Sequence, residues 1–72
     1  MYMNLKEIRE EKKLRQNVVA AKIGVTPQAV SNYEKGIREP NLMTLRKLAE
    51  TYEVTVDELV KAITDDENDH IG

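Results

Sequence analysis

The spacing of apolar residues along the chain predicts helices and no strands. Leu5 and Ile8 form one apolar stripe in a segment that otherwise carries Lys, Arg and Glu as far as about Leu14. A second stripe recurs at intervals of three and four residues, as on one face of a helix. It consists of Leu42, Leu45, Leu48, Ala49 and Tyr52. No segment alternates with a period of two, the pattern of a strand with one buried face.

Side chains that cap helices mark four of the expected helix starts. Asn and Thr side chains accept hydrogen bonds from the free backbone N–H groups of a first helical turn. The expected N-cap residues are Asn4, Thr26, Asn41 and Thr55. Two of them are followed three residues later by a glutamate, Glu7 or Glu58, which completes a capping box. Pro27 fits the first helical position, where no N–H is needed.

Glycines end two of these helices, and the pattern predicts an all-α domain. Gly24 and Gly36 stand where a helix commonly ends in a left-handed residue. The expected helices span about residues 5–14, 16–23, 27–35, 42–52 and 56–63. They predict a compact bundle of five short helices in residues 1–63. Residues 64–72 are acidic and carry little that is apolar, so we expect a disordered tail.

The composition excludes several classes of protein. A chain of 72 residues forms one small domain. It has no cysteine, which excludes a disulfide scaffold, a cysteine-based zinc finger and a thiol nucleophile, and fits a reducing compartment such as the cytoplasm. The longest apolar run, residues 18–21, is far too short to span a bilayer, and we see no apolar core of a signal peptide.

The net charge of −2 conceals a division of the chain into a basic and an acidic part. Residues 1–47 carry ten Lys and Arg against five Asp and Glu, a net charge of +5. Residues 48–72 carry one Lys against eight acids, a net charge of −7. The basic part is suited to face a polyanion, whereas the acidic part favours solubility.

Two short helices joined by a tight turn at residues 24–26 have the pattern of a helix-turn-helix. The first helix needs a small residue where the second crosses it, and Ala20 satisfies this. The turn needs a residue that tolerates positive φ, and Gly24 satisfies this. The second helix of such a motif enters the major groove of DNA.

The outer face of the helix at 27–35 is expected to present Gln28, Ala29 and Asn32, with Val30 and Tyr33 pointing inward. Gln and Asn donate and accept hydrogen bonds together, which suits the major-groove edge of adenine. The methyl group of Ala29 suits the methyl group of thymine. These three residues are therefore the candidate base readers.

A regular spacing of apolar, glycine and charged residues continues on both sides of the helix-turn-helix, through almost the whole chain. The pattern reads Leu5-x-x-Ile8-Arg9, Gln16-x-x-Val19-Ala20-x-x-Ile23-Gly24-Val25, Thr26-x-x-x-Val30-Ser31-x-Tyr33-Glu34-x-Gly36-x-Arg38-x-Pro40, Leu42-x-x-Leu45-x-x-Leu48-Ala49 and Val54-x-x-Asp57-Glu58-Leu59. In this register, about residues 4–63, the chain resembles the lambda-repressor-like helix-turn-helix family, also called the Cro or XRE type. The resemblance implies a non-enzymatic protein that binds double-stranded DNA and needs no cofactor.

The resemblance also implies roles for particular positions. Gln28 and Asn32 match positions that read bases, and Gln16 matches a glutamine that touches a phosphate and braces a base reader. The residues implied to hold the DNA backbone are Gln16, Arg15, Ser31, Lys35 and Arg38. Arg9 and Glu34 match a buried pair that links the first helix to the third. Removal of one partner would leave a buried charge and cost about 3–5 kcal/mol.

Three departures from the family pattern change these expectations. Arg15 stands where Ser or Thr usually caps the second helix; a lost cap costs about 1 kcal/mol, although the arginine gains a possible phosphate contact. Pro27 stands at a position that often reads a base, and it has no side-chain donor. Glu53 stands where Gly often ends the fourth helix, so it must adopt a left-handed conformation at a cost of about 1 kcal/mol.

One helix-turn-helix reads only a few base pairs, so we expect a homodimer on an inverted-repeat operator. The expected dimer interface is Val56, Val60 and Ile63, with Leu59 facing the core. Since the second helix carries no acid, by the resemblance we expect a repressor rather than an activator. The first alternative is an antitoxin-like or regulatory module whose main role is to bind a protein partner, through the apolar strip of Val18 and Ala21 or the acidic tail. The second is a DNA-binding subunit of a hetero-complex.

No catalytic motif accompanies these features. The chain has no P-loop, glycine-rich loop or zincin motif, and we find no nucleophile–base pair. His70 stands among four acids in residues 65–69, but one histidine in an acidic tail lacks the preorganisation of a metal site. We therefore expect no metal.

Overall fold

A computed structural model describes the backbone of residues 3–69 and the side chains of residues 3–64. These described residues fold into five helices. The helices are α1 (Leu5–Glu11), α2 (Gln16–Ile23), α3 (Pro27–Lys35), α4 (Leu42–Tyr52) and α5 (Val56–Asp69). The described residues contain no strand, and the expected all-α class is confirmed. None of the described helices is long and apolar enough to cross a membrane.

The expected caps form as the sequence predicted. Glu7 N donates to Asn4 Oδ1 and Asn4 N donates to Glu7 Oε1, each over 2.9 Å, so the capping box of α1 is complete. Thr26 Oγ1 accepts from the backbone at the start of α3 over 3.1 Å, and Asn41 Oδ1 does so for α4 over 2.8 Å. At the start of α5, Glu58 N donates to the hydroxyl of Thr55. These bonds fix where each helix begins.

Two helix ends differ from the expected positions. Helix α1 ends at Glu11 rather than about Leu14, because Lys13 adopts a left-handed φ of 58°. Helix α5 continues past Ile63 to Asp69, since no glycine or proline interrupts residues 56–71. Residues 64–69 are therefore helical rather than part of a disordered tail. The rest of the expected tail, residues 70–72, lies outside the described residues.

Each of the five helices contributes one face to the hydrophobic core. The buried apolar residues are Leu5, Ile8, Val19, Ala20, Ile23, Ala29, Val30, Tyr33, Leu48, Ala49, Tyr52, Leu59 and Ala62. Leu59 faces this core, as expected. Leu42 was expected on the buried face of α4, but it is 65% exposed. The buried residues of α4 lie in the C-terminal half of the helix, and Leu42 is its first residue.

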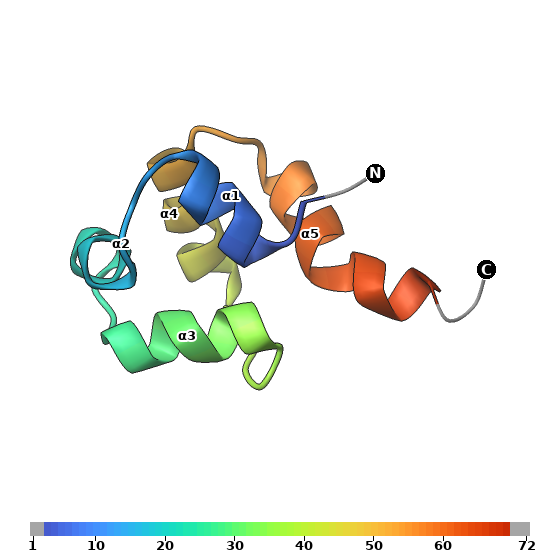
Figure 1. The fold of residues 1–72 in the computed structure, drawn as a ribbon, viewed down its shortest axis with the longest axis horizontal. Helices are drawn as coiled ribbons and strands as arrows, with labels where there is room; N and C mark the ends of the chain where they lie inside the picture. The colour runs from blue at the N-terminus through green and yellow to red at the C-terminus, as the bar shows by residue number, and fades with distance from the viewer. Residues whose placement is uncertain (1–2, 70–72) are drawn as a thin grey trace.

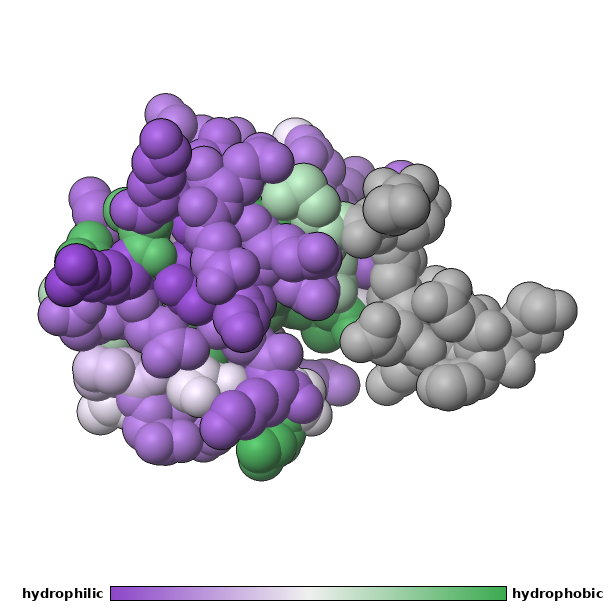
Figure 2. All heavy atoms as spheres, in the orientation of Figure 1, coloured by the Kyte–Doolittle hydropathy of each residue, from purple (hydrophilic) through white to green (hydrophobic). Residues whose placement is uncertain are grey.

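Helix α3 lies along one edge of the molecule (Figure 1). It packs mainly on α2 and also contacts α1, while α4 packs on α2 and α5. This arrangement buries the side of α3 that faces the other helices and leaves its outer side exposed. Most of the surface seen in Figure 2 is hydrophilic, with a few separate apolar patches.

Candidate nucleic-acid interface

The turn between α2 and α3 has the backbone that a helix-turn-helix requires. Gly24 ends α2 in the left-handed region, with φ 75° and ψ 33°. Its Cβ position is open, so glycine is favoured here by backbone conformation rather than by space. Val25 N donates to Ala20 O over 3.0 Å, and Ala20 is buried. The turn therefore holds α3 at a fixed angle to α2.

The outer side of α3 presents two side-chain amides that are hydrogen-bonded to each other. Gln28 Nε2 donates to Asn32 Oδ1 over 3.1 Å. Gln28 is exposed and Asn32 is half-buried. The bond leaves Asn32 with both amide hydrogens, and it leaves Gln28 with its oxygen and one hydrogen. The pair thus offers donors and an acceptor side by side on one helix face.

The third expected base reader, Ala29, is not on this face, and that prediction was wrong. Ala29 is only 5% exposed and belongs to the core with Val30 and Tyr33. Residues four apart share one face of a helix, so Ala29 lies beside the inward-pointing Tyr33. A buried methyl group cannot reach a base. The same four-residue spacing would have revealed this from the sequence.

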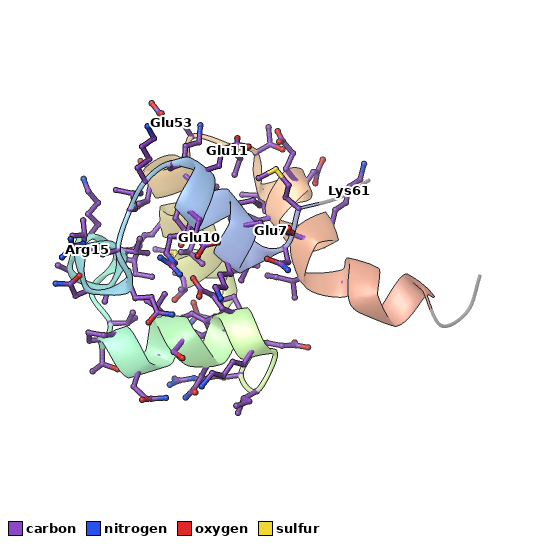
Figure 3. The ribbon with its side chains drawn as sticks, in the orientation of Figure 1. Glu7, Glu10, Glu11, Arg15, Glu53 and Lys61 are labelled. Carbon is purple, nitrogen blue, oxygen red and sulfur yellow. The ribbon has the colours of Figure 1, made fainter. Side chains whose placement is uncertain are left out.

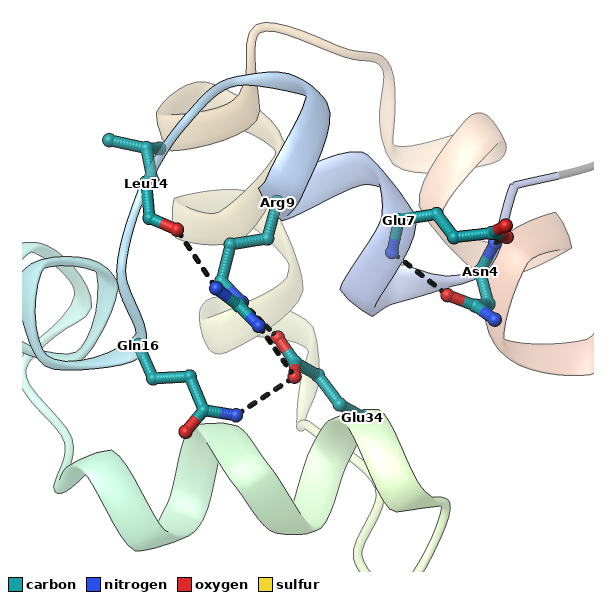
Figure 4. A network of polar contacts seen from close by, with 6 residues as sticks. All are labelled: Asn4, Glu7, Arg9, Leu14, Gln16 and Glu34. Atoms are coloured by element: carbon teal, nitrogen blue, oxygen red, sulfur yellow. Dashed lines mark hydrogen bonds and ion pairs between the residues drawn. The ribbon is translucent and has the colours of Figure 1, made fainter.

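A buried carboxylate links α1, α2 and α3 (Figure 4). The expected pair of Arg9 and Glu34 is present: Arg9 Nε donates to Glu34 Oε2 over 2.6 Å, and Nη2 donates to Oε1 over 3.3 Å. Arg9 Nη1 also donates to the carbonyl of Leu14 over 2.9 Å. Gln16 Nε2 donates to Glu34 Oε1 over 2.9 Å. The contact between Gln16 and Glu34 is one that the sequence did not predict.

The electrostatics of this network favour the charged form of Arg9. The side chains of Arg9 and Glu34 are 10% and 6% exposed. The hydrogen bond to Glu34 raises the pKa of Arg9, against the opposing effect of burial. Burial, helped by the negative charge of Glu34, raises the pKa of the Tyr52 phenol to about 12. The three helices are therefore joined through a desolvated ion pair whose carboxylate oxygens both accept hydrogen bonds.

The candidate phosphate contacts lie at the start of α2, on α3 and in the loop that follows it. Arg15 is exposed at the N-cap of α2 and makes no capping bond, as expected. Lys35 is exposed in the last turn of α3, and the guanidinium carbon of Arg38 lies 5.9 Å from the centre of the Tyr33 ring. Ser31 is half-buried on α3.

Two exposed acids, Glu11 and Glu53, lie away from this region, whereas the exposed Glu39 lies next to Arg38. Glu11 and Glu53 are at the side of the molecule opposite to α3, while Arg15 lies at the outer side of α2 (Figure 3). Glu53 ends α4 with φ 57° and ψ 44°, which confirms the expected left-handed conformation. The separation keeps these acids from repelling a polyanion at α3.

The expected dimer surface is only partly free. Val56 and Ile63 are half-buried and pack against the core of their own chain, whereas Val60 is 41% exposed. Val60 and Ile63 line a shallow groove together with Pro40 and Leu45. On α2, Val18 is 39% exposed and Ala21 is exposed, so the expected apolar strip lies on the surface.

The expectation that the chain holds no metal was based on His70 and the acids of residues 65–69, and the structure describes only the backbone of residues 65–69. His70 lies outside the described residues. Within the described part of the chain, no group of three or more His, Cys, Asp or Glu residues is placed to hold a metal ion.

Comparison with known proteins identifies similar sequences. Residues 5–59 match the family model described as helix-turn-helix. The chain is 43% identical to the uncharacterized HTH-type transcriptional regulator YqaE of Bacillus subtilis over 58 residues, which are 81% of this chain and 50% of that protein. It is 43% identical to the cryptic phage CTXphi transcriptional repressor RstR of Vibrio cholerae over 56 residues, which are 78% of this chain and 50% of that protein.

A third relative is the HTH-type transcriptional regulator ImmR of Bacillus subtilis. It is 38% identical over 56 residues, which are 78% of this chain and 44% of that protein. The chain therefore spans about half the length of these three relatives. No solved structure matches the chain.

Proposed function

The chain belongs to the helix-turn-helix family, and from this premise we propose that it is a transcriptional regulator that binds double-stranded DNA. The family match spans α1 to α4 and the start of α5, and the relatives are named as transcriptional regulators or repressors. Membership agrees with the expectation that the chain is not an enzyme. A cytoplasmic location stays a prediction.

The observation that carries the proposal is the amide pair of Gln28 and Asn32 on the exposed side of α3. With α3 in the major groove, these side chains would meet base edges. An amide that donates and accepts at once matches the N6 and N7 atoms of adenine. Because the two amides are bonded to each other, one of them would hold the other in place for such a contact.

The positions of the cations support a clamp on the DNA backbone. Arg15 precedes α2, Lys35 ends α3 and Arg38 follows it, so exposed positive charge is available from both helices of the motif. We propose that these residues, together with Ser31 and Gln16, contact phosphates. Such contacts fix the register on DNA but carry no sequence information.

A dimer on an inverted repeat is the finer part of the proposal. A single unit reads too few base pairs to select one genomic site, and two-fold symmetry places half-sites about one helical turn apart. Val60 is the exposed centre of the proposed interface, and Val56 and Ile63 form its half-buried border.

We propose that the protein represses transcription rather than activating it. Helix α2 carries no acidic residue that could serve as an activating contact. One of the similar proteins, RstR, is named a repressor.

A second function is favoured by the strip of Val18 and Ala21 on α2. An exposed valine beside an exposed alanine is a small apolar surface that a protein partner could cover. This alternative predicts a protein complex whose affinity does not change in Gln28→Ala. A hetero-complex through α5 predicts instead that the isolated chain is monomeric at micromolar concentration.

The proposal can be tested by following backbone amides in NMR spectra during titration with a mixed-sequence DNA duplex at low salt. We expect the amides of Gln16, Gln28, Asn32, Lys35 and Arg38 to shift together and to return when salt is added. If the α3 amides do not shift, the proposed DNA face is wrong, and capture of a protein partner on α2 or α5 becomes the next experiment.

A further inference from the structure

The loop after α3 carries the most exposed large apolar side chain described. Ile37 is 70% exposed, more than Leu42, Met43, Val60 or Val18. Figure 2 shows a compact apolar protrusion at the level of this loop, beneath the end of α3. Isolated apolar residues on a surface are common. This one differs because its backbone is held in place.

The loop is anchored to the helix that it follows. Ile37 N donates to the carbonyl of Asn32 over 3.0 Å, and Arg38 N donates to the same carbonyl over 3.3 Å. Gly36 supplies the left-handed residue that this turn requires, with φ 76°. The position of Ile37 is thus tied to the backbone of Asn32, whose side chain is a proposed base reader.

The loop also lies on the same side of the molecule as the outer face of α3. In Figure 1 the loop hangs below the C-terminal end of α3, away from α1, α2 and α4. Two exposed cations, Lys35 and Arg38, and one exposed acid, Glu39, lie within two residues of Ile37 in sequence. The Arg38 guanidinium lies near the ring of Tyr33. The side chain of Ile37 therefore lies beside the proposed phosphate contacts Lys35 and Arg38, in a segment with a net positive charge.

We infer that Ile37 is a DNA contact that packs against apolar atoms of the duplex beside the base reached by Asn32. This inference rests on the proposed function. DNA offers two such surfaces, the methylene and methine groups of deoxyribose and the methyl group of thymine. Either would cover an isoleucine that the folded chain leaves in water.

The experiment compares Ile37→Ser with Met43→Ser. Met43 is 61% exposed, and it lies on α4, which packs on α2 and α5 rather than mainly on α3. The probe is a duplex selected from a randomised library by the wild-type protein. We expect Ile37→Ser to weaken binding about tenfold, the ratio that partial burial of one isoleucine produces. Met43→Ser should bind as wild type does.

The salt dependence shows whether the contact is apolar. Because Ile37 neutralises no phosphate, the slope of log affinity against log salt should be the same in Ile37→Ser and in wild type. Substitution of uracil for thymine then separates the two sources. If Ile37 packs on a thymine methyl group, wild type and Ile37→Ser bind the uracil duplex equally. If it packs on deoxyribose, the tenfold difference persists.

Three results would overturn the inference: Ile37→Ser binds as tightly as wild type, it loses salt dependence together with affinity, or Met43→Ser is weakened equally. Matching thermal melting curves of the two variants establish that both are folded. Selection of no duplex by the wild-type protein would overturn the proposed function as well. A selected duplex that Ile37→Ser binds normally would overturn only the role of Ile37.

Discussion

The side-chain amide of Gln16 donates to Oε1 of Glu34 over 2.9 Å, so the first residue of α2 is bonded to the last turn of α3. The same carboxylate accepts from the guanidinium of Arg9 on α1. The proposed phosphate contact and the helix that would read bases are therefore fixed to one another through a single buried group. Displacement of Glu34 should affect both stability and DNA binding.

Glu34→Ala should lower the free energy of unfolding by about 3–5 kcal/mol, because it leaves the Arg9 guanidinium buried and unpaired. Urea denaturation followed by circular dichroism measures this. The control is the double variant Arg9→Met with Glu34→Leu, which removes both charges and should be clearly more stable than Glu34→Ala. Equal stability of Glu34→Ala and wild type would show that the pair contributes nothing.

Gln16→Ala should weaken DNA binding and reduce stability by about 1 kcal/mol, since it removes one hydrogen bond from a buried carboxylate. The matched control is Asn17→Ala, the adjacent exposed residue of α2. Affinity is measured by fluorescence anisotropy and stability by urea denaturation. Normal affinity in Gln16→Ala would restrict Gln16 to a structural role.

Gln28→Ala should cost about 1–3 kcal/mol on a selected site and relax the preference at one base pair. Because Gln28 and Asn32 are hydrogen-bonded, their effects should not add: the double alanine variant should lose less than the sum of the single variants. A double-mutant cycle measured by anisotropy tests this. Strict additivity would mean that the two amides act independently on DNA.

Arg38→Ala should weaken binding to all sequences and lower the salt slope by about 1, because it removes a phosphate partner. Lys6→Ala on α1 removes the same charge from a helix face shared with Glu10. It should leave the slope unchanged. If both variants change the slope equally, the effect comes from net charge rather than from a contact.

Much of the fold followed from local chemistry. The caps at Asn4, Thr26 and Asn41 and the left-handed residue Gly24 were predictable because a helix end is determined by a few adjacent groups. The end of α5 was not predicted correctly, because the acidic composition of residues 64–72 suggested disorder. No glycine or proline interrupts the helix in this segment before Asp69. Composition describes solvation, whereas a helix continues until a residue or contact stops it.

The candidate site was predicted less completely. The pair of Arg9 and Glu34 came from the family register. The bond from Gln16 to Glu34 depends on how α2 crosses α3, which spacing along one helix does not reveal. Ala29 was misplaced because the outer face of α3 was assigned too broadly. Ile37 carried no sequence signal, since isolated apolar residues on a surface are common.

Alkaline pH should destabilise the protein through Tyr52. Burial raises the pKa of its phenol in the folded chain to about 12, above the ordinary value of 10.0. Between these values the unfolded chain loses the proton and the folded chain keeps it, so stability falls as pH rises, by up to about 1.4 kcal/mol per pH unit. Below pH 10 this residue contributes no pH dependence.

Urea denaturation at pH 8 and at pH 11 should show the loss in wild type and a smaller loss in Tyr52→Phe. An identical decline in Tyr52→Phe and wild type would assign the alkaline sensitivity to other groups.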